Sequence, residues 1–210
     1  GLGLSVSDLI SGSALHPPMA LKTDLVLTGL RASGLSSNPS PQQLMSAVGD
    51  PFQPLALGLL LGARSAGHSV ILGGGAQMIA VLALAISAMR PALRSDFLSG
   101  VVIGTTAWLV EEEINSSSSG TSSLQCLMER VGEHFDVRLF GLATGLHFHE
   151  SSHKALRDYE LGYVKEGVGA GALALLAQLQ GASCSQLVEA CDKAMEELRF
   201  KSAPMSSLSS

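Results

Sequence analysis

Apolar residues fall into runs whose spacing predicts the elements of the chain. Helical spacing extends from Met19 to Leu30. The stretch 33–41 is rich in serine and proline and predicts a loop, in which Ser40 is placed to cap a helix that continues to Val48. The next run, Phe52 to Ala66, is almost wholly apolar and predicts a helix that is buried on all sides.

Short β-branched runs predict the strands of a parallel sheet. Val70 to Leu72 leads through a glycine turn into an apolar helix, Ala76 to Met89, and Val101 to Thr105 follows as a second strand. Strand, helix and strand at this spacing favour parallel pairing with a right-handed crossover. Val137 to Ala143 predicts a third strand. The expected fold is therefore a three-layer, Rossmann-like α/β domain with a mainly parallel sheet flanked by helices.

The rest of the chain gives weaker indications. Leu4 to Ala14 has the spacing of a helix end or a short strand before a proline break, and Asn115 to Ser123 has the composition of a mobile surface loop. Further helices are predicted at 124–133, 172–179 and 186–200. We therefore expect one α/β domain over residues 1–200, followed by a disordered tail over 201–210.

Composition narrows the class of protein. Hydrophobic residues make up 46% of the chain but aromatic residues only 4%, and 23 glycines permit close backbone packing, which is typical of an α/β enzyme. The uncharged stretch from Ser69 to Met89 is long enough to span a bilayer, but its three consecutive glycines and Gln77 favour a buried strand, turn and helix. We therefore expect no membrane association.

Charge and cysteine content exclude further classes. The formal net charge is -5 and the 13 lysines and arginines are scattered, so the sequence offers no basic surface for nucleic acid. The three cysteines form no CxxC pair, which indicates a reducing, cytoplasmic location. The chain starts at Gly1 without a basic and apolar leader, and we expect it to begin inside a longer gene product.

The segment Tyr163 to Gly171, with the sequence YVKEGVGAG, is the most informative for function. Its glycines permit a tight turn and leave backbone N–H groups at the start of a helix, where the helix dipole favours an anion such as phosphate. The same glycines could instead serve only to pack the turn against the sheet. The GxGxG pattern alone does not decide between these two interpretations.

Four segments together resemble one enzyme family. Besides Tyr163 to Gly171, they are Ser36 to Pro39, the apolar run Pro54 to Arg64 and the glycine-rich turn Leu72 to Met78. In this order they are similar to the C-terminal part of the nicotinate-nucleotide:dimethylbenzimidazole phosphoribosyltransferase family, including its archaeal and cyanobacterial relatives. The Thr-rich phosphate loop that this family carries further upstream has no counterpart here. A complete active site is therefore not expected in this chain, which we interpret as a C-terminal fragment of such an enzyme.

The resemblance implies transfer of a 5-phosphoribosyl group from nicotinate mononucleotide to a benzimidazole-type base, a step toward the lower ligand of a cobamide. It implies that Glu166 acts as general base, that no metal or other cofactor takes part, and that the protein is a homodimer. A carboxylate that removes the proton from one nitrogen of the acceptor makes the other nitrogen a better nucleophile. The identity of the acceptor base stays open.

Glycines and hydroxyls that follow the predicted strands complete the candidate site. Parallel strands bind ligands at their carboxyl ends, so we expect the turn after the first strand and the threonines that end the second to contact substrate. The residues around Glu166 belong to the same site. The candidate substrate-binding residues are Gly73, Gly74, Gly75, Gln77, Thr105, Thr106, Lys165, Gly167, Gly169 and Gly171. The better-studied bacterial members of the family carry an acidic residue near the first turn, and this sequence departs from that pattern.

Two polar clusters and one aromatic residue have plainer interpretations. His147 and His149 are spaced to share a strand face, and His153 is placed to start a helix. The three match no strong zinc pattern, so loop or interface histidines are favoured over a metal site. The run Glu111 to Glu113 is typical of a solvated face rather than of a magnesium site. Trp108 is interpreted as a packing residue.

Two other functions stay open. A dinucleotide-dependent oxidoreductase would use one of the glycine turns, but it needs an acidic ribose-binding residue at the end of the next strand, where this sequence has Thr105 and Thr106. A non-catalytic protein that binds a nucleotide or a cobamide precursor would need no general base. Turnover by the full-length protein separates both alternatives from the transferase.

Overall fold

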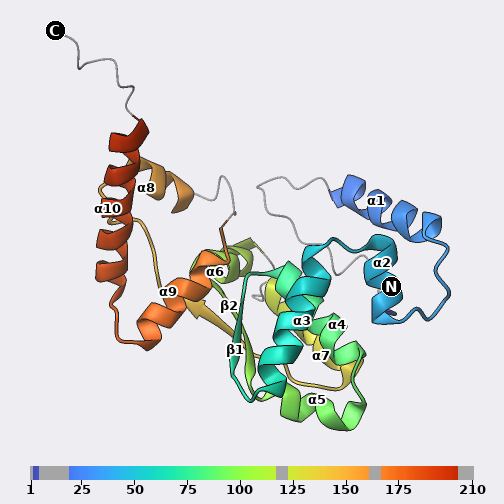
Figure 1. Ribbon diagram of the computed structural model, residues 1–210. Coiled ribbons are helices and arrows are strands. Elements are labelled where there is room, and N and C mark those ends of the chain that lie inside the picture. The colour runs from blue at the N-terminus through green and yellow to red at the C-terminus, as the bar shows by residue number, and fades with distance from the viewer. Residues whose placement is uncertain (1, 5–18, 117–122, 161–166, 203–210) are drawn as a thin grey trace.

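The computed structural model describes residues 2–4, 19–116, 123–160 and 167–202. Within them, three parallel strands form one sheet in the order β1-β2-β3, where β1 covers Val70–Gly73, β2 Val101–Thr106 and β3 Gly141–Thr144. Val70 pairs with Val101, and Ile103 with Gly141. Helices lie on both faces of this sheet (Figure 1), so the predicted Rossmann-like α/β fold with a parallel sheet is confirmed.

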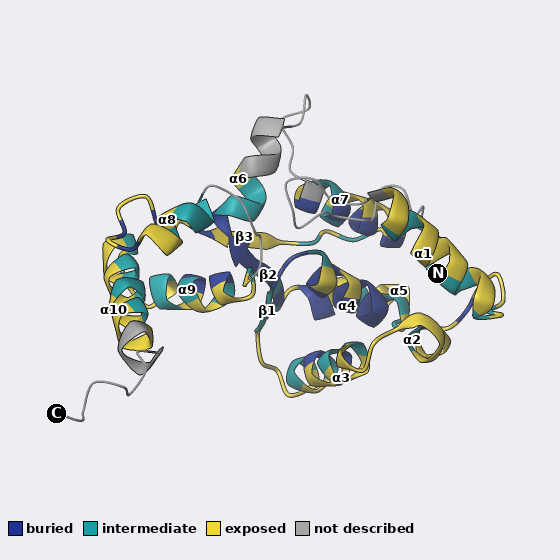
Figure 2. Ribbon diagram, turned by 90° about the horizontal axis from the view of Figure 1, so that it is seen from above, coloured by how far each residue is buried: buried dark blue, intermediate teal, exposed yellow. Residues whose placement is uncertain are grey.

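One face of the sheet carries the hydrophobic core. It is covered by α4 (Ala76–Ser87) and α7 (Ser123–Phe135), and α3 (Phe52–Ser65) packs against α4 and β1. Ala85 and Ile86 of α4 and Ile103 of β2 are fully enclosed, and Figure 2 shows α4 as the most deeply buried helix. Each fully buried aliphatic side chain stabilises the fold by roughly 1.5–3 kcal/mol. This face therefore fixes the position of the strands.

The other face of the sheet is covered by α9 (Ala170–Leu179), and small residues let this helix approach closely (Figure 2). A Cβ atom added at Gly104 would lie 2.6 Å from Ile71 Cγ2 and 3.2 Å from Ala172 Cβ, and one added at Gly73 would lie 2.8 Å from Ala172 Cβ. Only glycine fits at these two strand positions. Two further helices, α8 (Lys154–Glu160) and α10 (Cys184–Ser202), lie on the same side as α9.

The first two helices agree with the sequence prediction. They are α1 (Met19–Ala32) and α2 (Pro41–Val48). Ser40 caps α2 as expected: its hydroxyl accepts a hydrogen bond from the Gln43 N–H at 3.2 Å, while Gln43 Oε1 accepts one from the Ser40 N–H at 2.8 Å. This reciprocal capping box satisfies backbone donors that the first helical turn leaves unpaired.

The prediction that the helix of residues 52–66 is buried on all sides is wrong. α3 is present, but Phe52, Leu55 and Leu59 are 51%, 61% and 67% exposed. These three side chains are spaced to share one face of the helix, while Leu57 and Leu60 on the opposite face are buried. Within the described part of the chain, α3 has a packing partner on one side only, so its other apolar side faces outward.

Several element boundaries also differ from the prediction. α5 (Pro91–Leu98) and α6 (Ala107–Ser116) were not predicted, since both are short and lack a long apolar stripe, whereas α8 begins directly after His153, where a helix start was expected. α6 includes the start of the predicted loop at 115–123, and residues 117–122 lie outside the described part. β3 has four residues rather than the seven expected, because only Gly141 to Thr144 pair regularly with β2.

The described residues test the predictions for the two ends of the chain only in part. α10 extends to Ser202, so the first two residues of the predicted tail are helical, and 203–210 lie outside the described residues. The segment predicted at 4–14 also lies outside them, except for Leu4.

Cys126, Cys184 and Cys191 are free thiols, in agreement with the absence of a CxxC pair. Of the helices that the structure describes, none combines the length and apolar character needed to cross a membrane.

Candidate functional site

The carboxyl ends of the three strands meet at one edge of the sheet. β1 runs into the Gly73 to Gly75 turn that starts α4, β2 ends in Thr105 and Thr106, and β3 ends in Thr144. The parallel register places Gly73 beside Gly104 and Thr106 beside Thr144. Gly74 and Gly75 are buried against Met78 and Leu109, whereas Gln77 is exposed on the first turn of α4. The edge therefore brings the predicted turn and both predicted threonines together, with Gln77 facing solvent.

The N-terminus of α9 lies against this same edge. A Cβ atom added at Gly171 would lie 2.6 Å from the carbonyl carbon of Thr105, and one added at Gly169 would lie 3.3 Å from the carbonyl oxygen of Gly73. The glycine segment thus crosses the ends of β1 and β2 at backbone contact distance. Lys165 and the candidate base Glu166 lie outside the described residues, and the chain is described again from Gly167.

Several backbone N–H groups at the start of α9 are already hydrogen-bonded within the same segment. The N–H groups of Ala170, Gly171 and Ala172 donate to the carbonyl oxygens of residues 167, 168 and 169 at 2.8, 3.2 and 3.1 Å. These tight turns precede the regular helix. An anion at this helix end would therefore be bound by the N–H groups of residues 167–169, one turn earlier than the first residues of α9.

The hydroxyls of Thr105 and Thr106 are buried and, within the described residues, have no hydrogen-bond partner. The two threonines are only 2% and 4% exposed. Successive side chains of a strand point to opposite faces, so one hydroxyl faces the α7 side of the sheet and the other the α9 side. A buried hydroxyl without a partner costs about 1–3 kcal/mol. Each such group calls for an explanation, and a ligand at this edge of the sheet is one that the two threonines allow.

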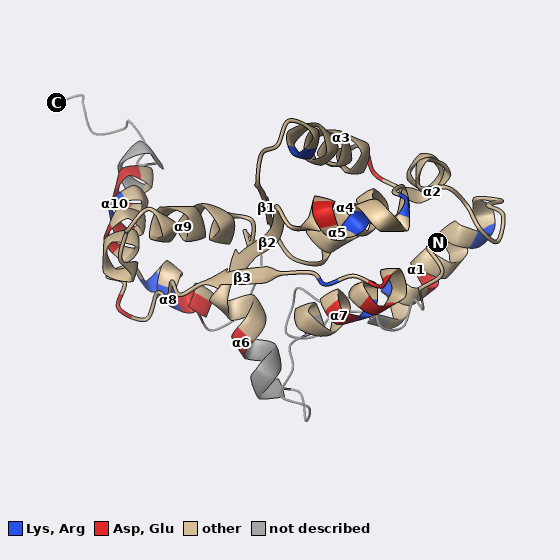
Figure 3. Ribbon diagram, turned by 90° about the horizontal axis from the view of Figure 1, so that it is seen from below, with Lys and Arg blue, Asp and Glu red and all other residues tan. Residues whose placement is uncertain are grey.

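A cavity of about 900 Å³ opens beside Thr105, between α7 and strands β2 and β3. This volume is in the range of small-molecule sites. Its walls are mainly apolar, and Gln125, Glu129, Glu133 and Arg138 contribute polar groups. Figure 3 shows acidic residues along α7, while lysines and arginines are spread over separate elements. The apolar lining residues include Ile103, Val110, Leu124, Met128, Val137, Leu139 and Leu142.

Thr144 ties the end of β3 to the two C-terminal helices, a role that the sequence did not indicate. Its hydroxyl donates to Gln178 Oε1 of α9 at 2.6 Å and accepts from the Leu146 N–H at 3.1 Å. Cys184 of α10 accepts from Gln178 Nε2 at 3.2 Å and donates to the Gly145 carbonyl at 3.3 Å. In contrast to Thr105 and Thr106, Thr144 is fully satisfied and serves the fold.

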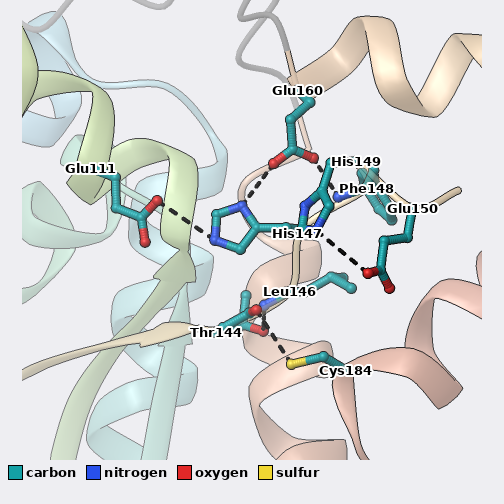
Figure 4. Close-up of polar contacts among 10 residues, drawn as sticks. Glu111, Thr144, Leu146, His147, Phe148, His149, Glu150, Glu160 and Cys184 are labelled. Atoms are coloured by element: carbon teal, nitrogen blue, oxygen red, sulfur yellow. Dashed lines mark hydrogen bonds and ion pairs between the residues drawn. The ribbon is translucent and has the colours of Figure 1, made fainter.

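A second polar cluster lies after β3, where His147 is placed between two carboxylates (Figure 4). Its Nδ1 is 2.7 Å from Glu160 Oε1, and its Nε2 is 3.5 Å from Glu111 Oε2. The other oxygen of Glu160 accepts the Phe148 N–H. Burial alone would raise the pKa of Glu160, but the neighbouring Trp108 indole and the hydrogen bonds with the Phe148 N–H and His147 outweigh it and lower the pKa.

The predicted histidines separate into two groups. His147 and His149 lie in an irregular segment with ring centroids 6.1 Å apart, rather than on a strand face. His153 is buried at the start of α8, where its N–H donates to Ser151 Oγ. Glu160, which completes the cluster, is far from the histidines in the sequence and carries no motif. Trp108 stacks on Phe148 with ring centroids 5.1 Å apart, which confirms its interpretation as a packing residue.

Comparison with known proteins gives relatives whose names state no activity. No family model matches the chain. It is 64% identical over 198 residues to a UPF0284 protein of Prochlorococcus marinus (strain MIT 9313) and 51% identical over 197 residues to one of Parasynechococcus marenigrum (strain WH8102). A UPF0284 protein of Picosynechococcus sp. (strain ATCC 27264 / PCC 7002 / PR-6) is 38% identical over 189 residues.

The chain spans about half the length of these relatives. The matches cover 94%, 94% and 90% of this chain but 49%, 49% and 48% of the relatives. This coverage is consistent with the interpretation of the chain as a portion of a longer protein. The activity, substrates and partners of the whole protein therefore belong to the proposals below.

Proposed function

We propose that the full-length protein transfers a 5-phosphoribosyl group from nicotinate mononucleotide to a benzimidazole-type base, with Glu166 as general base. The resemblance of Tyr163 to Gly171 to the glutamate and glycine segment of the phosphoribosyltransferase family suggests the reaction. One structural observation carries the proposal. Gly169 and Gly171, at the described end of this segment, lie against the backbones of Gly73 and Thr105 at the carboxyl edge of the sheet.

The groups at this edge suit a nucleotide donor. The N–H groups of residues 167–169 and the positive end of the α9 dipole would bind the phosphate. The buried hydroxyls of Thr105 and Thr106 would donate to ribose or phosphate oxygens, which would give them the partners they lack among the described residues. The nicotinate leaving group departs as the pyridinium loses its positive charge, so bond cleavage itself requires no additional acid.

The mainly apolar cavity beside Thr105 suits a planar aromatic acceptor. Glu166 would remove the proton from one ring nitrogen of the acceptor while the other nitrogen attacks the ribose carbon. Burial of the carboxylate next to such a base would raise its pKa and make it a stronger base. We place the protein in the cytoplasm because of its cysteine content, and as a homodimer because the resemblance implies it. We assign the missing phosphate loop to the part of the full-length protein outside this chain.

The alternatives predict different behaviour at the same edge. An oxidoreductase needs an acidic residue at the end of the strand after the glycine turn, and β2 ends in Thr105 and Thr106. A non-catalytic binding protein would use the same hydroxyls and cavity without turnover. The decisive difference is whether a covalent bond of nicotinate mononucleotide is broken.

The test follows nicotinate release from nicotinate mononucleotide by the untagged full-length protein, with and without a panel of aromatic bases. We expect release that depends on the base and falls about 100- to 10,000-fold in Glu166→Gln. Glu189→Gln, an exposed glutamate of α10, is the matched control and should retain activity. The chain of 210 residues alone should be inactive, because we assign the phosphate loop to the rest of the full-length protein. Binding of the nucleotide without release by well-folded full-length protein would contradict the transferase and support the non-catalytic alternative.

A further inference from the structure

Three side chains after β3 form a cluster that the proposed transfer reaction does not use. His147 and His149 come from the irregular segment that follows the strand, and Glu160 is the last residue of α8. One donor atom from each of the three lies within 4.8 Å of the donor atoms of the other two. Figure 4 shows the two imidazole rings and the Glu160 carboxylate converging on one region. Two imidazoles and a carboxylate are a ligand set that divalent transition metals prefer.

The separations within the cluster are close to those of a bound metal. Ligand atoms about 2.0–2.1 Å from a tetrahedral zinc ion lie about 3.3 Å from one another. His147 Nδ1 and Glu160 Oε1 are 2.7 Å apart, so this pair needs to open slightly, and the third donor needs to move inward by about 1.5 Å from the 4.8 Å limit. His149 can make this movement, because its side chain is 68% exposed and its Nε2 contacts the exposed Glu150 carboxylate at 3.9 Å, a contact that the movement can break at little cost.

The two carboxylates around His147 have different roles in this geometry. Glu160 faces Nδ1, and its other oxygen is held by the Phe148 N–H, so it is oriented toward the cluster. Glu111 of α6 faces the opposite ring nitrogen, Nε2, at 3.5 Å. A metal-binding histidine commonly donates its second N–H to a carboxylate, which fixes the tautomer and the orientation of the ring. Glu111 is placed to be that acceptor.

We propose that His147, His149 and Glu160 bind a divalent metal ion of the zinc class, with Glu111 orienting His147 as the hydrogen-bond acceptor of its second nitrogen. Three protein ligands leave a fourth coordination position for water or another small ligand. The ion would join α8 to the segment that follows β3. Because β3 ends at the carboxyl edge of the sheet, the site lies next to the candidate substrate edge, but it rests on the described residues of this chain alone and not on the proposed reaction.

The test uses the untagged chain after removal of metals by chelator and gel filtration, since a histidine tag would itself bind zinc. Calorimetric titration with Zn²⁺ should show one site per chain. Co²⁺ should give the absorption bands of a tetrahedral ion between about 500 and 700 nm, which report direct nitrogen and oxygen ligation. Metal binding should also release protons from the ligands, so the affinity should fall at acidic pH.

Substitutions distinguish the residues that bind the metal from those that only lie near it. His149→Ala removes an exposed side chain, so it should leave the fold intact while weakening Zn²⁺ binding by at least about tenfold. Glu160→Gln and His147→Gln should also weaken Zn²⁺ binding by at least about tenfold, and Glu111→Gln should weaken it less. His68→Gln, which changes an exposed histidine between α3 and β1, is the matched control and should bind zinc as the wild type does.

Two results would overturn the proposal. One is a Zn²⁺ affinity that is the same in the wild type and in His149→Ala. This variant should fold normally, so an unchanged affinity would show that His149 does not bind the ion. The other is a Co²⁺ complex without tetrahedral bands, which would indicate only loose, hydrated binding. In either case His147 would be interpreted as a histidine hydrogen-bonded between two carboxylates. Neither result would affect the nicotinate-release assay, so failure of the metal site and failure of the transferase are distinguishable.

Discussion

Gly171 of α9 lies directly against the backbone of Thr105 in β2. A Cβ atom at position 171 would lie 2.6 Å from the Thr105 carbonyl carbon and 2.7 Å from both its oxygen and the Thr106 nitrogen. These atoms belong to the main chain of a central strand and cannot rotate away. The contact therefore fixes the distance between the glycine segment and the carboxyl edge of the sheet.

Gly171→Ala should force α9 away from the sheet and destabilise the protein by about 1–3 kcal/mol. Gly62→Ala is the control, because Gly62 also lies inside a helix but a Cβ atom there meets nothing within 4 Å. That change should stabilise α3 by about 0.5–1 kcal/mol. Urea unfolding of both variants measures the free energies. Equal stability of Gly171→Ala and the wild type would contradict the close contact.

Thr105→Val and Thr106→Val should leave the stability of the ligand-free protein unchanged or raise it slightly. Valine has nearly the same shape as threonine, and these hydroxyls have no partner within the described residues. Thr144→Val should instead cost about 1–3 kcal/mol, because it leaves the Leu146 N–H and Gln178 Oε1 without their partner. Thermal unfolding compares the three. A marked loss of stability in Thr105→Val would show that its hydroxyl is satisfied.

The same two threonine variants should weaken nucleotide binding by the full-length protein. Loss of a hydrogen bond from a buried hydroxyl to a ligand costs about 0.5–1.5 kcal/mol, which corresponds to roughly a two- to tenfold weaker affinity. Titration calorimetry with nicotinate mononucleotide measures this change, with Thr28→Val in α1 as a control on an exposed helix face. Unchanged affinity in both strand variants would remove the threonines from the proposed site.

Asp192 of α10 should contribute stability that disappears in acid. Its carboxylate accepts hydrogen bonds from the Ser151 hydroxyl and from the hydroxyl and N–H of Ser152, and these bonds lower its pKa from 3.8 to about 2. A depressed pKa in the folded state stabilises the fold above the unfolded pKa, and this contribution is lost as the pH falls toward 2. Asp192→Asn should therefore be less stable than the wild type at pH 7.

The pH dependence provides the critical comparison for Asp192. The stability difference between wild type and Asp192→Asn should be constant above a pH of about 5 and should narrow as the pH falls toward about 2. Glu189→Gln, which changes an exposed carboxylate of the same helix, serves as the control for the substitution itself. Urea unfolding at several pH values measures the difference. A difference that stays constant down to pH of about 2 would exclude the carboxylate as its source.

Much of the sheet could be predicted from the sequence, because its strands are short β-branched runs followed by glycines or threonines. Val101 to Thr106 is buried on both faces and Val70 to Gly73 is half-buried to buried, and such strands appear as continuous apolar runs. The meeting of Gly73, Thr105 and the glycine segment at one edge follows from parallel pairing, and the described residues confirm it. The roles of Lys165 and Glu166 stay predictions.

The sequence singled out His147 and His149, but it could not predict the full cluster, because Glu160 joins them only through tertiary packing. α8 has the sequence KALRDYE, which contains no apolar stripe, so the sequence indicated a helix start at His153 but not the position of Glu160. Glu111 reaches the cluster from α6, a helix that was not predicted. The exposure of Phe52 in α3 has a related cause: composition indicates which residues are apolar, whereas the number of partners around a helix depends on the tertiary arrangement.

The contact among Gly73, Gly104 and Ala172 has a consequence for divergence of the sequence. A single larger residue at one of these positions would clash, so substitutions there can be accepted only when a neighbouring position becomes smaller. In distant homologues the three positions should therefore vary together. Distant sequences would therefore be aligned better by this pattern than by overall identity. The pattern is two glycines near the ends of neighbouring strands and a small residue in the first turn of α9.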